Sequence, residues 1–194
     1  MLIFWRERLV FLANTKTGST SIESALEGLA DVSVTRPAAL KHGGVSAFRR
    51  HIAPYLADLS GGGTFTTVAL VREPIDWLGS WFRDRAGHGD LPRGMDFAGF
   101  GRAFLTDPPP APARLVTQAE IVGDGRGGVG VDDLFRHDAI DLFVQFLEDR
   151  LGCEITLPRL NVSPAAPTDL PEDLRAALDA RLAPDRALYD AARG

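Results

Sequence analysis

The most informative stretch of this chain reads Leu9-Val10-Phe11-Leu12-Ala13-Asn14-Thr15-Lys16-Thr17-Gly18-Ser19-Thr20. Its first five residues form a continuous apolar run, which is typical of a strand that is covered on both faces. Polar residues and Gly18 then interrupt the run. From Ser19 onward apolar side chains return at helical spacing, and Ser19 or Thr20 is suited to cap that helix. The stretch therefore predicts a buried strand, a tight turn and a helix that ends near residue 28.

The same alternation continues along the rest of the chain. Further strands are expected over 32–34, 65–71 and 129–135, and further helices over 45–59, 74–82, 97–104, 139–151 and 174–192. Strands that alternate with helices and read as unbroken apolar runs favour a parallel sheet with helices on both faces. We therefore expect an α/β fold in which residues 1–194 form a single domain, a length that suits one hydrophobic core.

Composition excludes several classes of protein. There are 21 basic and 26 acidic residues, a formal net charge of −5, which argues against a surface built to bind nucleic acid. The one cysteine, Cys153, cannot form an internal disulfide, which favours a reducing compartment. Charged residues at 6–8 leave an apolar run too short for a signal peptide or a membrane span. These features predict a cytoplasmic protein with no transmembrane segment and leave its oligomeric state open.

Lysine is almost absent from the chain. Counting along the sequence gives 19 arginines and two lysines, Lys16 and Lys41. Arginine replaces an exposed lysine easily, whereas a site that needs a compact ammonium resists the replacement because guanidinium is larger and planar. Lys16 is therefore a candidate functional residue, while chance retention explains Lys41 equally well.

An anion-binding site is expected at the turn between the first strand and the first helix. Backbone N–H groups lack partners there, and the helix dipole adds partial positive charge. Gly18 lets the backbone approach a ligand closely, and Lys16 supplies a full charge. Hydroxyl groups are available on Thr17, Ser19 and Thr20. Lysine precedes the glycine, so the order differs from the Walker pattern GxxxxGK[ST]. The alternative is an ordinary helix start that binds no ligand.

A second candidate site follows the 65–71 strand. Arg72 leaves its carboxyl end, where open parallel sheets bind ligands, and Ser80 lies on the next helix. A guanidinium and a hydroxyl in these places suit a second phosphate. The alternative is that Arg72 pairs with Glu73 or Asp76 at the surface. Downstream, Arg83 and Arg85 either receive an anion or, as is more common, are solvated at a helix end.

Together the two motifs resemble those of the sulfotransferases that use 3′-phosphoadenosine 5′-phosphosulfate, in particular the bacterial, carbohydrate-type branch. That family has a Pro-Lys-Thr-Gly-(Ser/Thr)-(Ser/Thr) loop after a strand, and further along a Val-Arg-(Asp/Glu)-Pro motif followed by a helical serine. The chain departs from the family at Thr15, where proline is usual, and at Glu73, where aspartate is common. The matching residues are Lys16, Thr17, Gly18, Ser19, Thr20, Arg72, Pro74 and Ser80.

The resemblance implies a P-loop-NTPase-like sulfotransferase fold and transfer of a sulfuryl group from that nucleotide to a hydroxyl or amine. It places the 5′-phosphosulfate at residues 16–20, the 3′-phosphate at Arg72 and Ser80, and a closing segment at Asn161 and Ser163. The acceptor is a small molecule, a lipid or a carbohydrate. By analogy with phosphoryl transfer, Lys16 would neutralise charge on the leaving oxygen, with no metal required.

A general base is needed to take the acceptor's proton. His42 is the candidate, because it follows the 32–34 strand and imidazole titrates near neutrality. A surface histidine is the alternative reading, and Glu23 in the first helix is the rival base. His88 lies in a loop that is suited to border the acceptor. Gln118 and Glu120 are also placed to border it. His137 is a less attractive candidate for the general base.

Two other functions remain open from the sequence. One is a phosphotransferase in which Lys16 and the glycine turn hold ATP, although the chain lacks the Walker order and a persuasive metal-binding carboxylate. The other is a non-catalytic protein that binds a nucleotide or another anion. A catalytic protein needs a base near Lys16, and a sensor does not.

Overall fold

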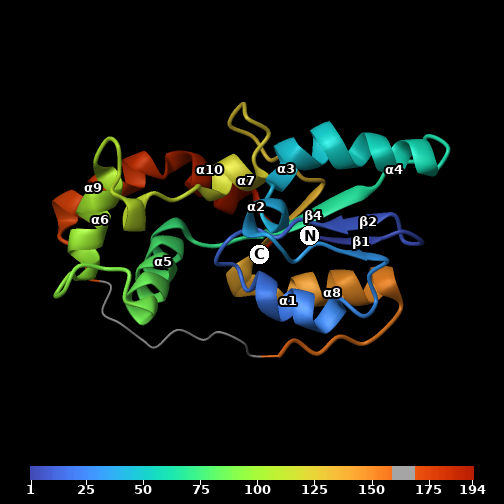
Figure 1. Cartoon of the computed structure of the whole chain (residues 1–194), viewed down its shortest axis with the longest axis horizontal. Helices are drawn as coiled ribbons and strands as arrows, with labels where there is room; N and C mark the ends of the chain where they lie inside the picture. Colours follow the sequence, from blue (N-terminus) through green and yellow to red (C-terminus); the bar gives the residue numbers. More distant parts are fainter. Residues whose placement is uncertain (159–168) are drawn as a thin grey trace.

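The computed structural model describes residues 1–158 and 169–194 and shows an α/β architecture (Figure 1). Asn161 and Ser163 lie outside these residues. In the described part of the chain, five strands form one sheet in the order β3-β1-β2-β4-β5. The strands are β1 (Leu2–Phe4), β2 (Leu9–Phe11), β3 (Val32–Ser33), β4 (Thr66–Val71) and β5 (Asp133–Arg136).

The expectation of a purely parallel sheet is wrong. Strands β2, β4 and β5 are parallel, but β1 pairs antiparallel with β2 on one side and with β3 on the other. The reason is the turn at residues 5–8, where Arg8 adopts a left-handed φ of 51° and the chain reverses direction. A three-residue strand is too short to show a periodicity, so β1 could not be predicted from local patterns. The sheet is mixed, and its parallel part contains both candidate motifs.

Helices cover both faces of the sheet, as expected. On one face the core forms between the strands and two helices, α1 (Ser19–Leu26) and α8 (Ile140–Leu151). Figure 1 shows this pair below the sheet. The opposite face is covered by α3 (Gly44–Ala47), α4 (Ala53–Leu59), α7 (Gln118–Val122) and α10 (Ala183–Ala191). Strands β2 and β4 are therefore buried on both faces, which explains their unbroken apolar sequences.

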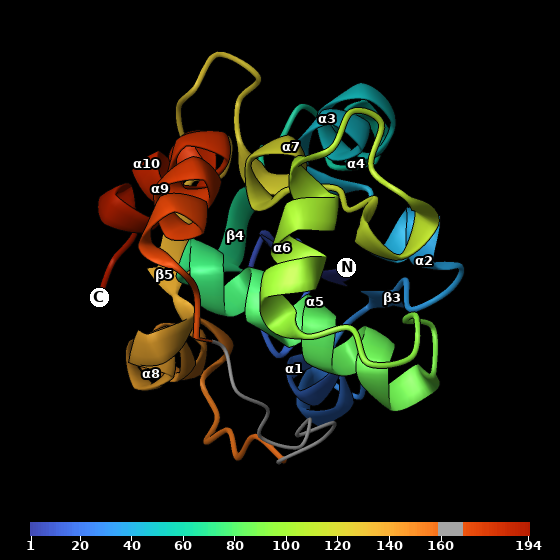
Figure 2. The ribbon, with the colours of Figure 1, turned by 90° about the vertical axis from the view of Figure 1, so that its left-hand side faces the viewer.

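A third apolar cluster lies beyond the sheet. It joins α5 (Pro74–His88), α6 (Phe97–Leu105) and α9 (Glu172–Arg181), and it includes Trp77, which is fully buried. Figure 2 shows α5 and α6 in front of the strands. Helix α5 therefore connects the end of β4 to this second layer, and its first turns stand beside the candidate site.

Several helix boundaries follow local sequence signals, with an exception at the candidate site. Glu73 caps α5 through a 2.7 Å hydrogen bond from the Asp76 N–H, Pro74 is its first residue, and Gly152 ends α8 in the left-handed conformation. The exception is α1, where neither Ser19 nor Thr20 is the cap. Gly18 precedes the helix with a φ of +75°, and no side chain in the described residues caps it.

Two of the expected helices are interrupted. The 45–59 segment contains α3, a π-helical turn at Phe48–Ile52 and α4, while the tail helix is divided into α9 and α10 at Leu182. Pro184 explains the second interruption, since it is tolerated only in the first turn of a new helix. Within residues 1–158 and 169–194, no helix combines the length and apolarity that crossing a membrane requires.

Both edges of the sheet are short. On one side the edge strand β3 has two residues. On the other side Arg193 adds an isolated parallel bridge to Phe135, with its N–H donating to Leu134 O at 2.8 Å and its carbonyl accepting from the Arg136 N–H at 2.9 Å. The segment after α10 therefore lies along β5.

Candidate active site

The backbone conformation and hydrogen bonds to Asn14 determine the shape of the turn between β2 and α1. Lys16 and Gly18 both adopt left-handed conformations, with φ of 59° and 75°. The Thr15 N–H donates to Asn14 Oδ1 at 2.8 Å, and the buried Thr17 hydroxyl donates to the Asn14 carbonyl at 3.1 Å. Thr17 therefore stabilises the turn from inside. No side chain caps α1 within the described residues, and the N–H groups of Ser21 and Ile22 donate to the Gly18 carbonyl at 3.0 and 3.2 Å.

A buried amide joins this turn to the end of β4. The Gln118 side chain is fully buried, and its Oε1 accepts hydrogen bonds from Asn14 Nδ2 at 3.2 Å and from the Arg72 N–H at 2.8 Å. Its Nε2 donates to the Arg72 carbonyl at 2.8 Å, while Asn14 Nδ2 also donates to Leu70 O. Gln118 was expected to border the acceptor. The structure instead makes it the connection between the two motifs.

Arg72 reaches across to the turn. Its Nη1 donates to the Lys16 carbonyl at 3.1 Å, and its Nε donates to Asp76 at 2.6 Å. Arg83 also approaches Asp76, at 3.5 Å. Ser80, which is buried, lies one helical turn beyond Asp76 and one before Arg83, so the three share a face of α5. The guanidinium of Arg72 and the Ser80 hydroxyl therefore lie along one side of the site.

Both arginines influence the Asp76 carboxyl. Burial raises its pKa, but the hydrogen bond and charge of Arg72, together with those of Arg83, outweigh burial and hold the pKa below its usual value. The carboxyl is thus charged at neutral pH and neutralises part of this cationic cluster.

Lys16 points toward α5. Its Nζ lies 2.7 Å from Asp84 Oδ1 and 5.2 Å from the centre of the Trp81 ring. The Lys16 side chain is about one-fifth exposed, so the ammonium is accessible at the edge of the site. Nothing in the sequence alone indicated Asp84, because its role depends on the packing of α5 against the turn.

His42 lies next to the same turn. Its Nδ1 is 2.8 Å from the carbonyl oxygen of Ala13, the residue just before Asn14. Burial lowers the His42 pKa, partly offset by this backbone hydrogen bond, so the imidazole is neutral at pH 7. The rival base, Glu23, is engaged elsewhere. It is buried and forms an ion pair with Lys41 at 2.5 Å, which also gives the second lysine a structural role.

The structure makes His137 a stronger candidate site residue than the sequence patterns indicated. It directly follows β5, and a Cβ placed on Gly18 would lie 3.8 Å from its Nε2. Burial and the charge of Arg72 lower the His137 pKa. Its neighbours Arg136 and Asp138 are occupied by Tyr189, whose hydroxyl accepts from the first at 2.8 Å and donates to the second at 2.7 Å. The signal that points to His137 is its position at the carboxyl end of a parallel strand, as for Arg72.

A small cavity opens on the other side of the turn. We call it the Trp81 cavity, and its volume is about 280 Å³. It is lined by Thr15, Ala38, Ala39, His42, Trp81, Arg85, Arg114, Leu115, Val116 and Ile121. Thr15 belongs to the turn, and Lys16 lies over the indole of Trp81. The cavity therefore adjoins the candidate anion site and contains the candidate base.

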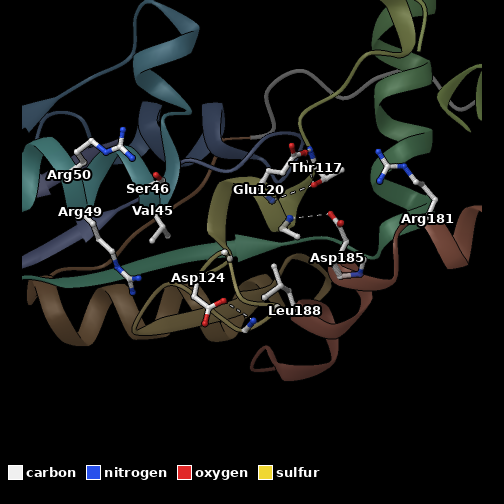
Figure 3. A pocket seen from close by; sticks show the side chains of 16 residues that line it. Val45, Ser46, Arg49, Arg50, Thr117, Glu120, Asp124, Arg181, Asp185 and Leu188 are labelled. Carbon is white, nitrogen blue, oxygen red and sulfur yellow. Dashed lines mark hydrogen bonds between the residues drawn. The ribbon is translucent and has the colours of Figure 1, made fainter. Parts of the chain in front are cut away.

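A larger cavity of about 780 Å³, here called the Asp185 cavity, lies behind α7 (Figure 3). Asp185 is 1% exposed, and its Oδ1 accepts hydrogen bonds from the N–H groups of Gln118 at 2.7 Å and Ala119 at 3.4 Å. Figure 3 shows Asp185 on α10 directed toward α7, with Arg49 and Arg50 on the opposite wall. Asp185 thus holds α7, and with it Gln118, in place.

The structure brings most of the expected site residues together. Residues 16–20, Arg72 and His42 converge at the carboxyl ends of β2 and β4, and Ser80 lies on the adjoining face of α5. His88 does not join them: it ends α5, is exposed, and its Nδ1 lies near the Asp84 carbonyl. In the described part of the chain, no group of three or more His, Cys, Asp or Glu residues is arranged to hold a metal ion.

Comparison with protein-family models, with curated proteins and with solved structures gave no match for this chain. The chemistry of the site therefore carries the functional proposal.

The Gln118 amide is expected to be a major source of stability. Gln118→Ala leaves the partly buried Arg72 N–H and carbonyl and the buried Asn14 amide without their partner, so the free energy of unfolding should fall by about 2 kcal/mol. Gln145→Ala, at an exposed glutamine on α8, is the matched control and should change it by less than about 0.5 kcal/mol. Urea denaturation measures both. Equal effects would show that the amide does not hold the two motifs.

Asp185 makes stability depend on pH. Burial raises its pKa to about 6, so the folded state binds a proton more readily than the unfolded chain. The resulting stabilisation is complete below the unfolded pKa near ~3.9 and is lost as the pH rises through about 6, by at most roughly 3 kcal/mol.

The substitution Asp185→Asn keeps an oxygen for the Gln118 N–H and removes the titration. Relative to this variant, the wild-type protein should lose stability in urea denaturation between pH 4 and pH 7. Asp58→Asn, at an exposed position on α4, is the control. If the difference in unfolding free energy between the wild-type protein and Asp185→Asn stays constant with pH, Asp185 does not titrate with a raised pKa.

Proposed function

We propose that this protein is a sulfotransferase that moves a sulfuryl group from 3′-phosphoadenosine 5′-phosphosulfate to a hydroxyl or amine of a small-molecule, lipid or carbohydrate acceptor. The observation that carries the proposal is the direct contact of the two motifs: Arg72 donates to the Lys16 carbonyl, and both motifs stand at the carboxyl ends of neighbouring parallel strands. Open parallel sheets bind nucleotides at this edge.

The residues present fit a nucleotide that carries an anionic group at each end. The exposed Gly18 and the uncapped start of α1 suit the 5′-phosphosulfate, because backbone N–H groups and the helix dipole both favour an anion there. Arg72, Ser80 and Arg83 lie along the neighbouring strand end and helix, and they suit the 3′-phosphate. The β2–α1 and β4–α5 units support a sulfotransferase-type, P-loop-like fold for the parallel part of the sheet.

Lys16 stabilises the leaving group in this proposal. The bond between sulfur and the bridging oxygen of the nucleotide breaks as the bond between sulfur and the acceptor atom forms, so negative charge grows on the bridging oxygen. In the structure the ammonium is held by Asp84 and Trp81 at the border of the Trp81 cavity. From there it lies between the uncapped helix and the acceptor. A half-buried ion pair of this kind is weak enough to exchange for a ligand.

His42 accepts the proton that the acceptor loses. When Nδ1 donates to the Ala13 carbonyl, the lone pair of Nε2 is free to bind a proton. The lowered His42 pKa keeps that nitrogen unprotonated at neutral pH. His42 lines the Trp81 cavity, so an acceptor hydroxyl in that cavity stands in the same enclosure as the imidazole. The products are the sulfated acceptor, adenosine 3′,5′-bisphosphate and protonated His42.

Nucleotide binding tests the proposal. Adenosine 3′,5′-bisphosphate should bind in EDTA, as measured by calorimetry. Arg72→Ala should weaken it by about tenfold or more while leaving adenosine 5′-phosphate nearly unaffected, because only the bisphosphate carries the group that Arg72 contacts. Arg102→Ala, at an exposed position on α6, is the control and should change neither affinity. Binding of ATP with magnesium and not of the bisphosphate would contradict the proposal and favour the phosphotransferase alternative.

Single-turnover rates separate binding from catalysis. Lys16→Ala should slow transfer by at least ~10²-fold and weaken nucleotide affinity less, because the ammonium acts on charge that develops in the transition state. Lys16→Arg should restore the rate only in part, since a planar fork does not replace a compact ammonium.

The pH profile distinguishes His42 from Lys16. The wild-type rate should be constant around neutrality and fall only below the usual histidine pKa of ~6.5, because the pKa of His42 is lowered. His42→Ala should remove this acidic limb and slow transfer without changing nucleotide affinity.

Retention of the full rate in Lys16→Ala would refute the mechanism.

A further inference from the structure

The Trp81 cavity has walls of two kinds. One part of the lining is apolar and includes Leu115, Val116 and Ile121. The charged part comes from two cations, Arg85 and Arg114, and among the described residues no Asp or Glu lines the cavity. The acidic partner of Arg85, Asp90, lies outside the lining, at 3.1 Å from Nη1. The cavity therefore favours an anionic ligand with an apolar body.

Two buried donors in this lining have no partner. Trp81 Nε1 and Arg85 Nε are both shielded from solvent, and neither makes a hydrogen bond within the described residues. Buried N–H groups are almost always paired, because leaving one unpaired costs its full desolvation energy. The Arg85 guanidinium lies 5.1 Å from the centre of the Trp81 ring, so the two donors belong to one stacked pair. Because neither atom is accessible to solvent, a ligand in the cavity meets the rest of this guanidinium, whose side chain is 30% exposed and which can hold a carboxylate.

We propose that the Trp81 cavity binds a small hydroxylated carboxylic acid, with its carboxylate at Arg85 and Arg114 and its apolar body against Leu115 and Val116. The assignment of this acid as the sulfuryl acceptor rests on the function proposed above. The hydroxyl of the acid shares the cavity with His42, the base, and with Thr15 of the turn. A neutral sugar would leave the charge of both arginines unused, and a cation would be repelled by them.

Binding without nucleotide tests the cavity by itself. The probes are 4-hydroxyphenylacetate and its neutral analogue 4-hydroxyphenylacetamide, followed by calorimetry and by tryptophan fluorescence. The wild-type protein should bind the acid at least about tenfold more tightly than the amide. Arg85→Gln should bring the two affinities close together, whereas Trp81→Phe, which retains an aromatic wall, should preserve the preference for the acid. Arg102→Gln is the exposed control and should preserve the preference.

The outcomes separate this inference from the proposed function. Equal binding of acid and amide by the wild-type protein, or no binding of either, overturns the inference even when adenosine 3′,5′-bisphosphate binds. Loss of bisphosphate affinity in Arg85→Gln with no change in acid affinity also overturns it, because the arginine then serves the nucleotide. Preferential acid binding without any bisphosphate binding supports the cavity assignment and refutes the sulfotransferase.

Discussion

The Gln118 side chain forms hydrogen bonds that determine where every other part of the site can lie. Its amide joins Asn14, which starts the turn after β2, to Arg72, which ends β4. A buried amide has no water to replace a lost partner, so these segments keep one relative position. The N–H of the same residue is held by Asp185 on α10. The position of the turn therefore depends on α10, whose Asp185 lies 67 residues beyond Gln118 in the sequence.

The chemistry on the two sides of the turn is different. On one side, the charge of Arg72 lies beside backbone donors and the His137 ring, a combination that suits phosphate or sulfate groups. On the other side, the Trp81 cavity is small, largely apolar and adjacent to His42. Lys16 is the residue that belongs to both sides, since it is part of the turn and lies over Trp81. The proposed transfer requires the sulfuryl donor and the acceptor to meet beside Lys16, with their reacting atoms in contact.

Much of this site could be predicted from local patterns. The strand, turn and helix at 9–26, the cap of α5 and the end of α8 each follow from a few adjacent residues, and the structure contains them. The antiparallel strand β1 and the short helix α7 could not be predicted, because three and five residues carry too little periodicity. Contacts between segments far apart in the sequence could not be predicted either. The role of Asp84 and the unpaired donors of Trp81 and Arg85 become visible only when α5 packs beside the turn.

The shortness of both sheet edges has a consequence for how copies of this chain meet each other. An exposed strand edge offers a row of unpaired N–H and carbonyl groups on which a second chain can add a strand. Here one edge ends after the two residues of β3, and the other is occupied by Arg193 along β5. Within residues 1–158 and 169–194 the sheet offers no long free edge. The fold therefore protects itself from edge-to-edge aggregation by geometry, without placing lysines along its outer strands.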